Sequence, residues 1–231
     1  GVPQSRHAHA LLGGGAQAIE TLFPGILEEM VAAGAPFLDF NDGRWHQAGG
    51  YRAPSNIDRK VVGGSRPFIE SHLRRRVRDL PNVLIETEVT VDGLAHEAGG
   101  VRGSRVHGAD GPRTLMAGLV FDCSGRASRA PRWLQELGYA APEVAEVRCD
   151  VRYGTVVLRR TPTDLDAAFA IAIESPPYGK RSGFLLPIEG GQFKVSDYLT
   201  TAPRLPDTGM KLGIVGLLDQ QVVADEETGN L

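Results

Sequence analysis

Cysteine is scarce in this sequence. The 231 residues include two cysteines, Cys123 and Cys149. Two cysteines cannot build a disulfide framework, and a metal site based on cysteine would need more of them. We therefore expect no metal site, and a reducing, cytoplasmic location fits the composition best.

Long apolar runs are missing as well. No stretch of 18 apolar residues occurs, so we expect no membrane span. The chain does not open with a basic segment and an apolar core, so we expect no signal peptide. It begins with Gly1 rather than Met, in what reads as the middle of a motif, and we expect it to be a piece of a longer protein.

An excess of one charge is the third absence. Lys and Arg number 25 and Asp and Glu 28, which gives a formal net charge of -3. Nucleic-acid binding needs a strongly basic domain, so we expect no nucleic-acid partner. The arginines at 74, 75, 76 and 78 could bind phosphate, but a solvated helix face is favoured in a chain that is not basic overall.

Hydrophobic residues, by contrast, make up 42% of the chain, as in ordinary soluble globular proteins. Helical spacing of apolar residues predicts helix over residues 8–33, with a second helix starting at Pro24, and over residues 65–80, where Ser65 can act as the cap. A helix is also predicted over residues 128–137. Strands are predicted over residues 83–86, 89–97, 101–108 and 114–123.

The pattern of predicted elements changes after about residue 142. Further strands are predicted over residues 147–160, 168–174, 182–189 and 192–199, which suggests an antiparallel sheet. The apolar run at residues 115–121 is continuous, and such a strand is usually covered on both faces, as in an α/β core. The expected fold class is therefore mixed α/β (α+β).

Residues 13–18, Gly-Gly-Gly-Ala-Gln-Ala, loosely fit a dinucleotide-binding fingerprint, and Asp39 stands where a ribose-binding acid could be. That motif needs a buried strand leading directly into the glycines. Here the preceding segment is short and polar, so a patch of small residues at a helix start is the favoured interpretation. A nicotinamide-dependent dehydrogenase that uses these glycines stays an alternative. His7 and His9 could together hold a metal, but hydrogen-bonded or exposed histidines are the default.

Residues 122–129, Asp-Cys-Ser-Gly-Arg-Ala-Ser-Arg, carry the most information about function. They follow the apolar strand and precede a helix, and ligands of α/β sheets bind beyond the carboxyl ends of strands. Asp122 can accept a hydrogen bond from a ribose or ribityl hydroxyl, and Gly125 allows close backbone approach. Ser128 can cap the following helix. A well-capped turn without function is an equally good interpretation of the same residues.

This segment resembles the corresponding motif of FAD-dependent monooxygenases with the p-hydroxybenzoate hydroxylase fold. The opening Gly-Val-Pro-Gln-Ser-Arg-His-Ala-His-Ala-Leu-Leu is similar to a segment of bacterial FAD-dependent oxidoreductases of that superfamily. The likeness continues through residues 22–25, 65–67, 121–134 and 186–191, and covers the chain up to about residue 200.

The resemblance implies a fold and a set of roles. Residues 1–142 would be a partial FAD-binding, Rossmann-like domain with a β-meander, and residues 143–231 a partial antiparallel substrate-binding domain. No catalytic residue is implied, and the expected electron donor is NAD(P)H. The implied FAD-binding residues are Arg66, Val89, Asp122, Gly125 and Arg129.

Two signatures of that family are missing. Its N-terminal βαβ unit with G-x-G-x-x-G would precede Gly1, and its later Gly-Asp motif would follow Leu231. Residues 204–231 match nothing in it. The resemblance therefore implies a fragment of a flavin-dependent monooxygenase acting on a small organic molecule. A non-catalytic remnant or small-molecule-binding module, and a flavin-dependent reductase of a polyprenyl or lipid substrate, stay open, as do the substrate and the oligomeric state.

Overall fold

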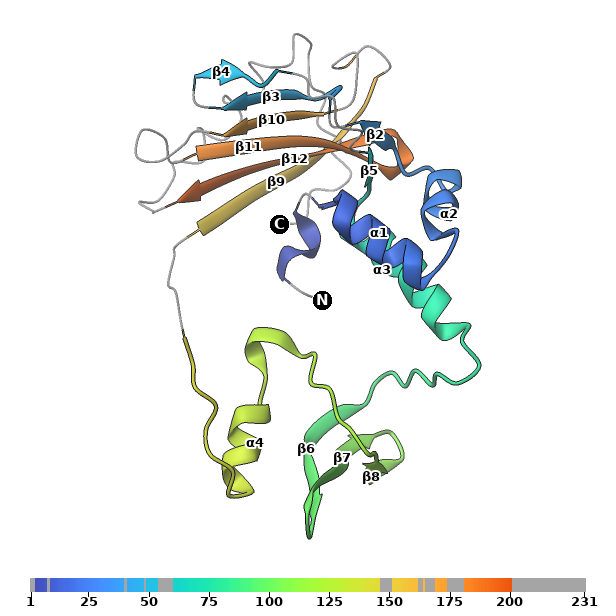
Figure 1. The fold of residues 1–231 in the computed structure, drawn as a ribbon, viewed down its shortest axis with the longest axis vertical. Coiled ribbons are helices and arrows are strands. Elements are labelled where there is room, and N and C mark those ends of the chain that lie inside the picture. Colours follow the sequence, from blue (N-terminus) through green and yellow to red (C-terminus); the bar gives the residue numbers. More distant parts are fainter. Residues whose placement is uncertain are drawn as a thin grey trace. The chain divides into compact units, whose positions relative to one another are not determined.

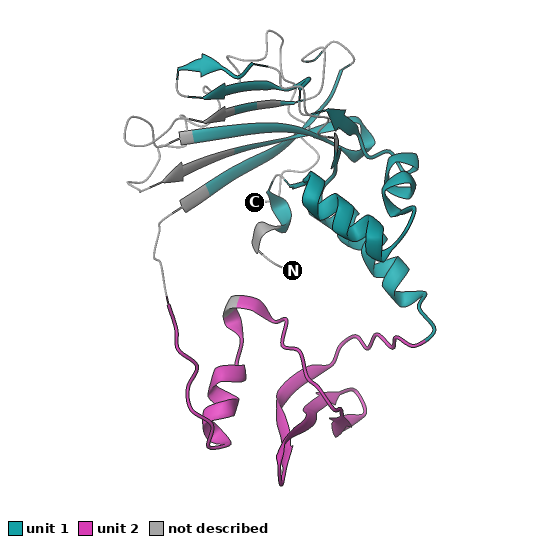
Figure 2. Ribbon diagram, viewed as in Figure 1, with its two compact units in different colours: residues 1–81, 148–231 teal, residues 82–147 magenta. Residues whose placement is uncertain are grey.

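The computed structural model describes residues 3–7, 9–39, 41–47, 49–53, 60–145, 151–161, 164, 169–173 and 181–200 (Figure 1). The chain forms two compact units. Unit 1 comprises residues 1–81 and 148–231, and unit 2 comprises residues 82–147 (Figure 2). These bounds differ from the predicted division at residue 142. The assignment of a partial FAD-binding domain to residues 1–142 and of a substrate domain to residues 143–231 stays a prediction.

The helices of unit 1 come from the first third of the chain. The predicted helix over residues 65–80 is confirmed as α3, Arg66–Arg78, whose cap Ser65 accepts a 3.3 Å hydrogen bond from the Phe68 N–H. The region 8–33 is less helical than predicted, because a short strand precedes the helices there. Its elements, with the 3-10 helix before them, are η1 Pro3–Arg6, β1 Ala10–Leu11, α1 Gly13–Leu22 and α2 Ile26–Ala32.

A small sheet lies beside these helices (Figure 1). Strand β5, Lys60–Gly63, pairs antiparallel with β1 on one side and with β2, Phe37–Asp39, on the other. The helices cover it with an apolar cluster whose fully buried members are Ile26, Met30, Ala35 and Val62. Burial of such side chains, at about 25 cal/mol per Å² of apolar surface, stabilises this corner of unit 1.

The larger sheet of unit 1 has six strands in the order β4-β3-β10-β11-β12-β9. The predicted antiparallel strands are confirmed in the second half of the chain, and two short strands from the first half join them. One pair, β3 with β10, is parallel, so the sheet is not purely antiparallel. The strands are β3 Arg44–Gln47, β4 Gly50–Tyr51, β9 Val151–Arg159, β10 Ala170–Ile173, β11 Arg181–Ile188 and β12 Gln192–Thr200, with η3 Glu189–Gly191 between the last two.

Unit 2 is built on a three-stranded meander. Strands β6 Thr90–Glu97, β7 Gly100–Gly108 and β8 Gly111–Met116 pair in sequence order, and tight turns join them where the glycines predicted turns. The 3-10 helix η2, Gly125–Ala127, and the helix α4, Ala130–Glu136, follow. The predicted meander is therefore confirmed. The strand predicted over residues 83–86 is wrong, because that segment is irregular.

The prediction for the apolar run at residues 115–121 is also wrong. Strand β8 ends at Met116, and the residues after it are irregular. The side chains of Leu119 and Phe121 are 69% and 80% exposed rather than buried on two faces. Among the described residues β8 pairs only with β7, so no second strand and no covering helix shields this run.

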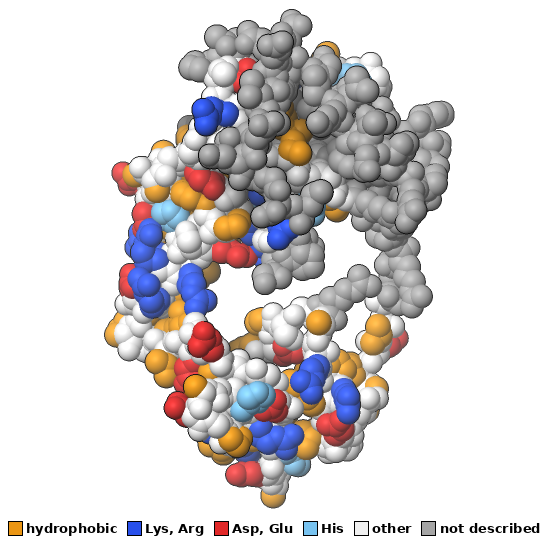
Figure 3. All heavy atoms as spheres, turned by 180° about the vertical axis from the view of Figure 1, so that it is seen from behind, with side chains coloured by type: hydrophobic (Ala, Val, Ile, Leu, Met, Phe, Trp, Pro, Cys, Tyr) orange, Lys and Arg blue, Asp and Glu red, His pale blue; other side chains and the backbone are white. Residues whose placement is uncertain are grey.

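Two further observations concern the surface. Within the described residues, no helix is both long and apolar enough to cross a bilayer. On the face drawn in Figure 3, acidic and basic side chains are interspersed rather than gathered into a field of one sign. The apolar segment at residues 212–223 and Cys149 lie outside the described residues.

Candidate cofactor and substrate site

Residues 122–129 form an exposed corner that follows the meander in unit 2. The Asp122 carboxylate accepts a 2.9 Å hydrogen bond from the Ser124 N–H and a second, short one from the Ser128 hydroxyl. A hydrogen bond from the Ser124 side chain, followed by those from the Ser128 hydroxyl and the Ser124 N–H, lowers the pKa of Asp122, so the carboxylate is ionised at neutral pH. Ser128 in turn accepts a 3.1 Å bond from the Ala130 N–H, which confirms its predicted role at the start of the helix.

Gly125 lies at the exposed turn of this corner. Its φ of 76° is in the left-handed region, which favours glycine. A Cβ atom at this position would have no other atom within 4 Å, so the backbone there is open to a ligand. Four residues later, the Arg129 guanidinium lies 5.3 Å from the centre of the Trp133 ring, a cation–π contact that orients the arginine on α4.

The other two predicted residues lie apart from this corner in the sequence. Val89 directly precedes β6 and follows Glu88, whose φ of 59° marks a turn of the backbone. Arg66 starts α3 in unit 1, where its Nε donates a 2.5 Å bond to Glu70 one turn later. The structure thus brings Asp122, Gly125 and Arg129 together in one loop and places Val89 in the same unit, whereas Arg66 belongs to the other unit.

A second polar cluster, in unit 1, was missed by the sequence analysis. The His7 Nδ1 and the Thr155 hydroxyl are 2.8 Å apart, and the Thr155 and Ser196 hydroxyls are 2.7 Å apart. The His7 ring also lies 5.1 Å from the Tyr153 ring. The two hydrogen bonds join His7, which directly follows η1, to β9 and β12 in a continuous chain.

Lys194 belongs to the same sheet face, and 5% of its surface is exposed. Burial lowers the pKa of Lys194, an effect that the negative charge of Glu189 partly offsets. Burial and, to a smaller extent, the charges of Lys194 and His9 lower the pKa of His7, so its imidazole is neutral at pH 7. The alternation of Phe193, Lys194, Val195 and Ser196 in the sequence was the available signal, because it places a lysine on one face of a buried strand.

Three other motifs were considered as sites: the two histidines His7 and His9, the arginines of α3, and the glycines at residues 13–15. The His9 Nδ1–H donates a 3.0 Å bond to the His7 carbonyl oxygen, and no cluster of three metal-ligating side chains occurs among the described residues. Arg75 and Arg76 contact the Glu29 carboxylate, so they form ion pairs rather than a free phosphate site. The glycines at 13–15 follow the two-residue strand β1 and lie in the first turn of α1. Strands β1 and β2 run parallel to each other, but the antiparallel strand β5 lies between them, so they are not the adjacent parallel strands of a dinucleotide-binding βαβ unit.

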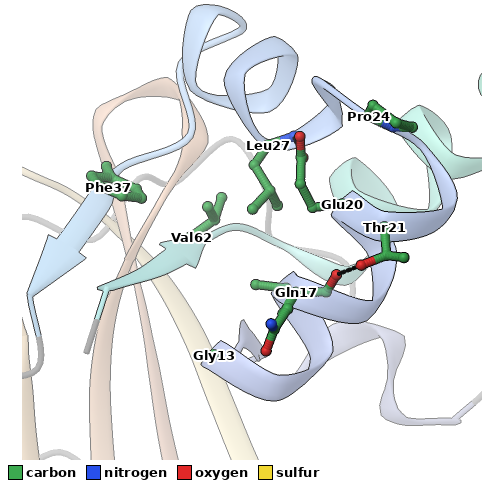
Figure 4. Close-up of a pocket in the computed structure, with 9 residues that line it drawn as sticks. Gly13, Gln17, Glu20, Thr21, Pro24, Leu27, Phe37 and Val62 are labelled. Carbon is green, nitrogen blue, oxygen red and sulfur yellow. Dashed lines mark hydrogen bonds between the residues drawn. The ribbon is translucent and has the colours of Figure 1, made fainter. Parts of the chain in front are cut away.

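A pocket of about 520 Å³ lies between α1, α2 and the small sheet (Figure 4). Its one carboxylate, Glu20, is already engaged: it accepts bonds of 2.5 Å from the Gly25 N–H and 3.1 Å from the Leu27 N–H. Most of its wall is apolar, and none of the predicted site residues lines it. The residues around it are Gly13, Ala16, Gln17, Glu20, Thr21, Pro24, Leu27, Phe37 and Val62.

Comparison with solved structures assigns the fold. The probable FAD-dependent monooxygenase PqsL from Pseudomonas aeruginosa matches 84% of this chain with a TM-score of 0.64 and 15% sequence identity. The flavin-dependent brominase Bmp2 matches 90% of it with a TM-score of 0.60 and 16% identity. The chain has the fold of the FAD-dependent monooxygenases. This confirms the mixed α/β class and the fold predicted from the sequence motifs.

The chain spans about half the length of these structures, 51% in each case. Protein Rv3254 from Mycobacterium tuberculosis is 36% identical to it over 166 residues, which make up 67% of this chain and 35% of that protein. No family model matches the chain.

Proposed function

We propose that this chain is part of a FAD-dependent oxidoreductase, an NAD(P)H-dependent monooxygenase that acts on a small organic molecule in the cytoplasm. The observation that carries the proposal is the corner at residues 122–129. It joins an ionised, exposed carboxylate to an open glycine backbone, in a chain with the fold of FAD-dependent monooxygenases.

The corner fits part of a flavin dinucleotide. The hydrogen bonds to Asp122 come from the Ser124 side chain, the Ser128 hydroxyl and the Ser124 N–H, and a carboxylate has about four acceptor positions, so one remains for a ribityl or ribose hydroxyl. Gly125 leaves the backbone accessible on the same loop. Arg129 supplies a positive charge close by, which suits the pyrophosphate. Val89 would contribute a backbone contact to the adenine, and Arg66 would lie near the isoalloxazine or the ribityl chain.

The chain's own residues would bind and orient rather than react. When bound, FAD supplies the electron transfer and the oxygen chemistry. The protein's part in such a reaction is to hold cofactor and substrate together and to exclude water from them. No acid, base or nucleophile is required of residues 122–129, and we name none as catalytic.

The test measures FAD binding by quenching of flavin fluorescence, using the product of the complete reading frame that contains this sequence. Replacing Asp122 by alanine removes the hydroxyl acceptor and should weaken FAD binding about tenfold or more, as expected for a charge-assisted hydrogen bond. Asp110→Ala is the matched control, because Asp110 is an exposed acid in a turn of the same unit. Its affinity for FAD should not change.

Two results would contradict the proposal. A colourless product that does not bind added FAD would favour a non-catalytic binding module. Equal FAD affinity in the Asp122 and Asp110 variants would show that residues 122–129 do not contribute to FAD binding. Oxidation of NADPH and of NADH by the flavin-loaded product then tests the electron donor separately.

A further inference from the structure

Lys194 is a nearly buried lysine that has no counter-ion among the residues the structure describes. Only 5% of the surface of Lys194 is exposed, yet Lys194 forms no hydrogen bond or ion pair with any other residue in the described part of the chain. A buried charge is costly unless it is paired, so the neighbourhood of Lys194 shows whether another group can neutralise it.

Glu189 is the acidic side chain that attracts Lys194, but it has other partners. One carboxylate oxygen accepts a 2.7 Å bond from the Ser65 N–H, and the other bonds to the Ser65 hydroxyl. Glu189 therefore caps α3 and forms no ion pair with Lys194. His7 is a second titratable group near Lys194, and its charged form is disfavoured by burial and by Lys194 itself. Among the described residues of unit 1, the charge of Lys194 is thus left without a full partner.

Hydroxyl groups lie on the same sheet face as Lys194. Ser196 lies two residues along β12 and so points to the same side as Lys194. Thr155 is paired with Ser196 across the strands, and its hydroxyl contacts both Ser196 and His7. A group that binds at Lys194 therefore meets a row of hydrogen-bonding side chains already held in place.

The opposite flank of Lys194 is apolar. Leu186 is paired with Lys194 and Phe184 with Ser196 on β11, so both point to this face, and both pack against the buried cluster of Leu38, Val61, Phe169 and Ile171. One cation, adjacent hydroxyls and an apolar border suit a singly charged organic anion better than a doubly charged phosphate, which a single ammonium would not neutralise.

We propose that Lys194, with Thr155 and Ser196 beside it, binds the carboxylate of a small organic molecule on this face of the six-stranded sheet. The proposal rests on the proposed function only in identifying that molecule as the substrate of the flavin enzyme. The binding itself requires no FAD, so its test is separate from the test of cofactor binding.

The experiment uses this chain without added FAD, labelled with carbon-13 at the lysine ε-carbon. The chain has four lysines, Lys60, Lys180, Lys194 and Lys211, and the signal of Lys194 is the one missing in Lys194→Met. The pH titration of that signal is recorded alone and with benzoate, with the neutral analogue benzamide, or with inorganic phosphate. Benzoate should raise the pKa of Lys194, whereas benzamide and phosphate should leave it unchanged.

The variant gives an independent measurement. Lys194→Met should lower the affinity for benzoate by about tenfold or more, because the charge-assisted bond is lost. The variant should unfold at a higher denaturant concentration than the wild type, because it no longer buries a charge. Arg74→Met, which removes one exposed cation from the outer side of α3 in the same unit, should bind benzoate as the wild type does.

Three outcomes would overturn the proposal: a titration of Lys194 that benzoate does not shift, equal shifts with benzoate and benzamide, or a shift with phosphate alone. The wild-type titration decides between them even if Lys194→Met does not fold. Loss of FAD binding in the separate test would leave this result unaffected.

Discussion

Glu29 links α2 to α3 through three side-chain contacts. Its carboxylate lies 2.7 Å from the Nδ1 of His72 and 2.8 Å from the Nε of Arg76, and it also contacts the guanidinium of Arg75. His72 is buried, and its ring lies 4.6 Å from the Phe68 ring. The hydrogen bond with His72, together with those from Arg75 and Arg76, lowers the pKa of Glu29 to about 2.

Replacing Glu29 by glutamine should therefore destabilise unit 1 by roughly 1–3 kcal/mol at pH 6, the range for lost hydrogen bonds to charged groups. The folded-state pKa lies below the ordinary value of 4.5, so this stabilisation is present above about pH 4.5 and is lost as the pH falls toward 2. Urea denaturation at pH 6 and pH 3 measures it. The difference between wild type and variant should shrink at pH 3.

Glu28→Gln is the control for this prediction. Glu28 is exposed, lies in the same first turn of α2, and carries the same charge near the same helix end. A loss of stability in Glu28→Gln as large as that in Glu29→Gln would attribute the effect to the helix end rather than to the contacts with α3.

At the scale of single residues, the sequence predicted which serines cap helices better than it predicted which acidic residue pairs with the arginines of α3. Ser65 and Ser128 were predicted as caps from their positions before helices, and both accept bonds from the helix N–H groups. The arginines of α3 were predicted on a solvated face, whereas two of them pair with Glu29. Glu29 lies more than forty residues away in the chain, and local spacing carries no information about such a partner.

At the scale of elements, the β7–β8 pairing depends on one glycine. Gly103 has a φ of 152°, and a Cβ atom there would lie 2.0 Å from the carbonyl oxygen of Leu115 on β8. Real atoms do not approach so closely, so any side chain at this position must push the strands apart.

Replacing Gly103 by alanine should thus destabilise the meander of unit 2 by about 1–3 kcal/mol, in the range for overpacking. Faster hydrogen exchange of the β7 and β8 amides, with little change in α3, would be the expected sign. Gly118→Ala is the control, because a Cβ atom at Gly118 would have no neighbour within 4 Å. If the exchange rates changed equally in both variants, the close contact with Leu115 would not be the cause.

The elements that the sequence predicted correctly are those with a local signal. Helix α3 has its cap and its proline, and the hairpins of the meander have their glycines. Residues 83–86 and 117–123 were predicted as strands from apolar composition, which cannot show whether a neighbouring strand is there to accept hydrogen bonds. The parallel pair of β3 with β10 was missed for a related reason, because its two segments are far apart in the chain.

At the scale of the whole molecule, one unusual surface feature among the described residues is the apolar run after β8. Leu119 and Phe121 are largely exposed, as are Met116 at 62% and Leu84 at 83%. Replacing Phe121 by glutamate should lower the fluorescence of a dye that binds apolar surface and reduce aggregation. The free energy of unfolding should change by less than about 0.5 kcal/mol, as for other surface substitutions.

Thr114→Glu is the matched control, because it adds the same charge on exposed β8 without removing apolar surface. Its dye fluorescence should equal that of the wild type. A large loss of stability in Phe121→Glu would instead show that the Phe121 side chain is buried in solution.

The insertion of unit 2 between the two parts of unit 1 has a consequence for biosynthesis. On the ribosome, the meander of residues 82–147 emerges complete and can close its hairpins at once. Strand β3 emerges earlier, yet its partner β10 is translated only after the whole insertion. Strand β3 can pair with β4 early, and the helices can pack on the small sheet, but the other edge of β3 stays open until β10 is made; during that interval the nascent chain would depend most on chaperones.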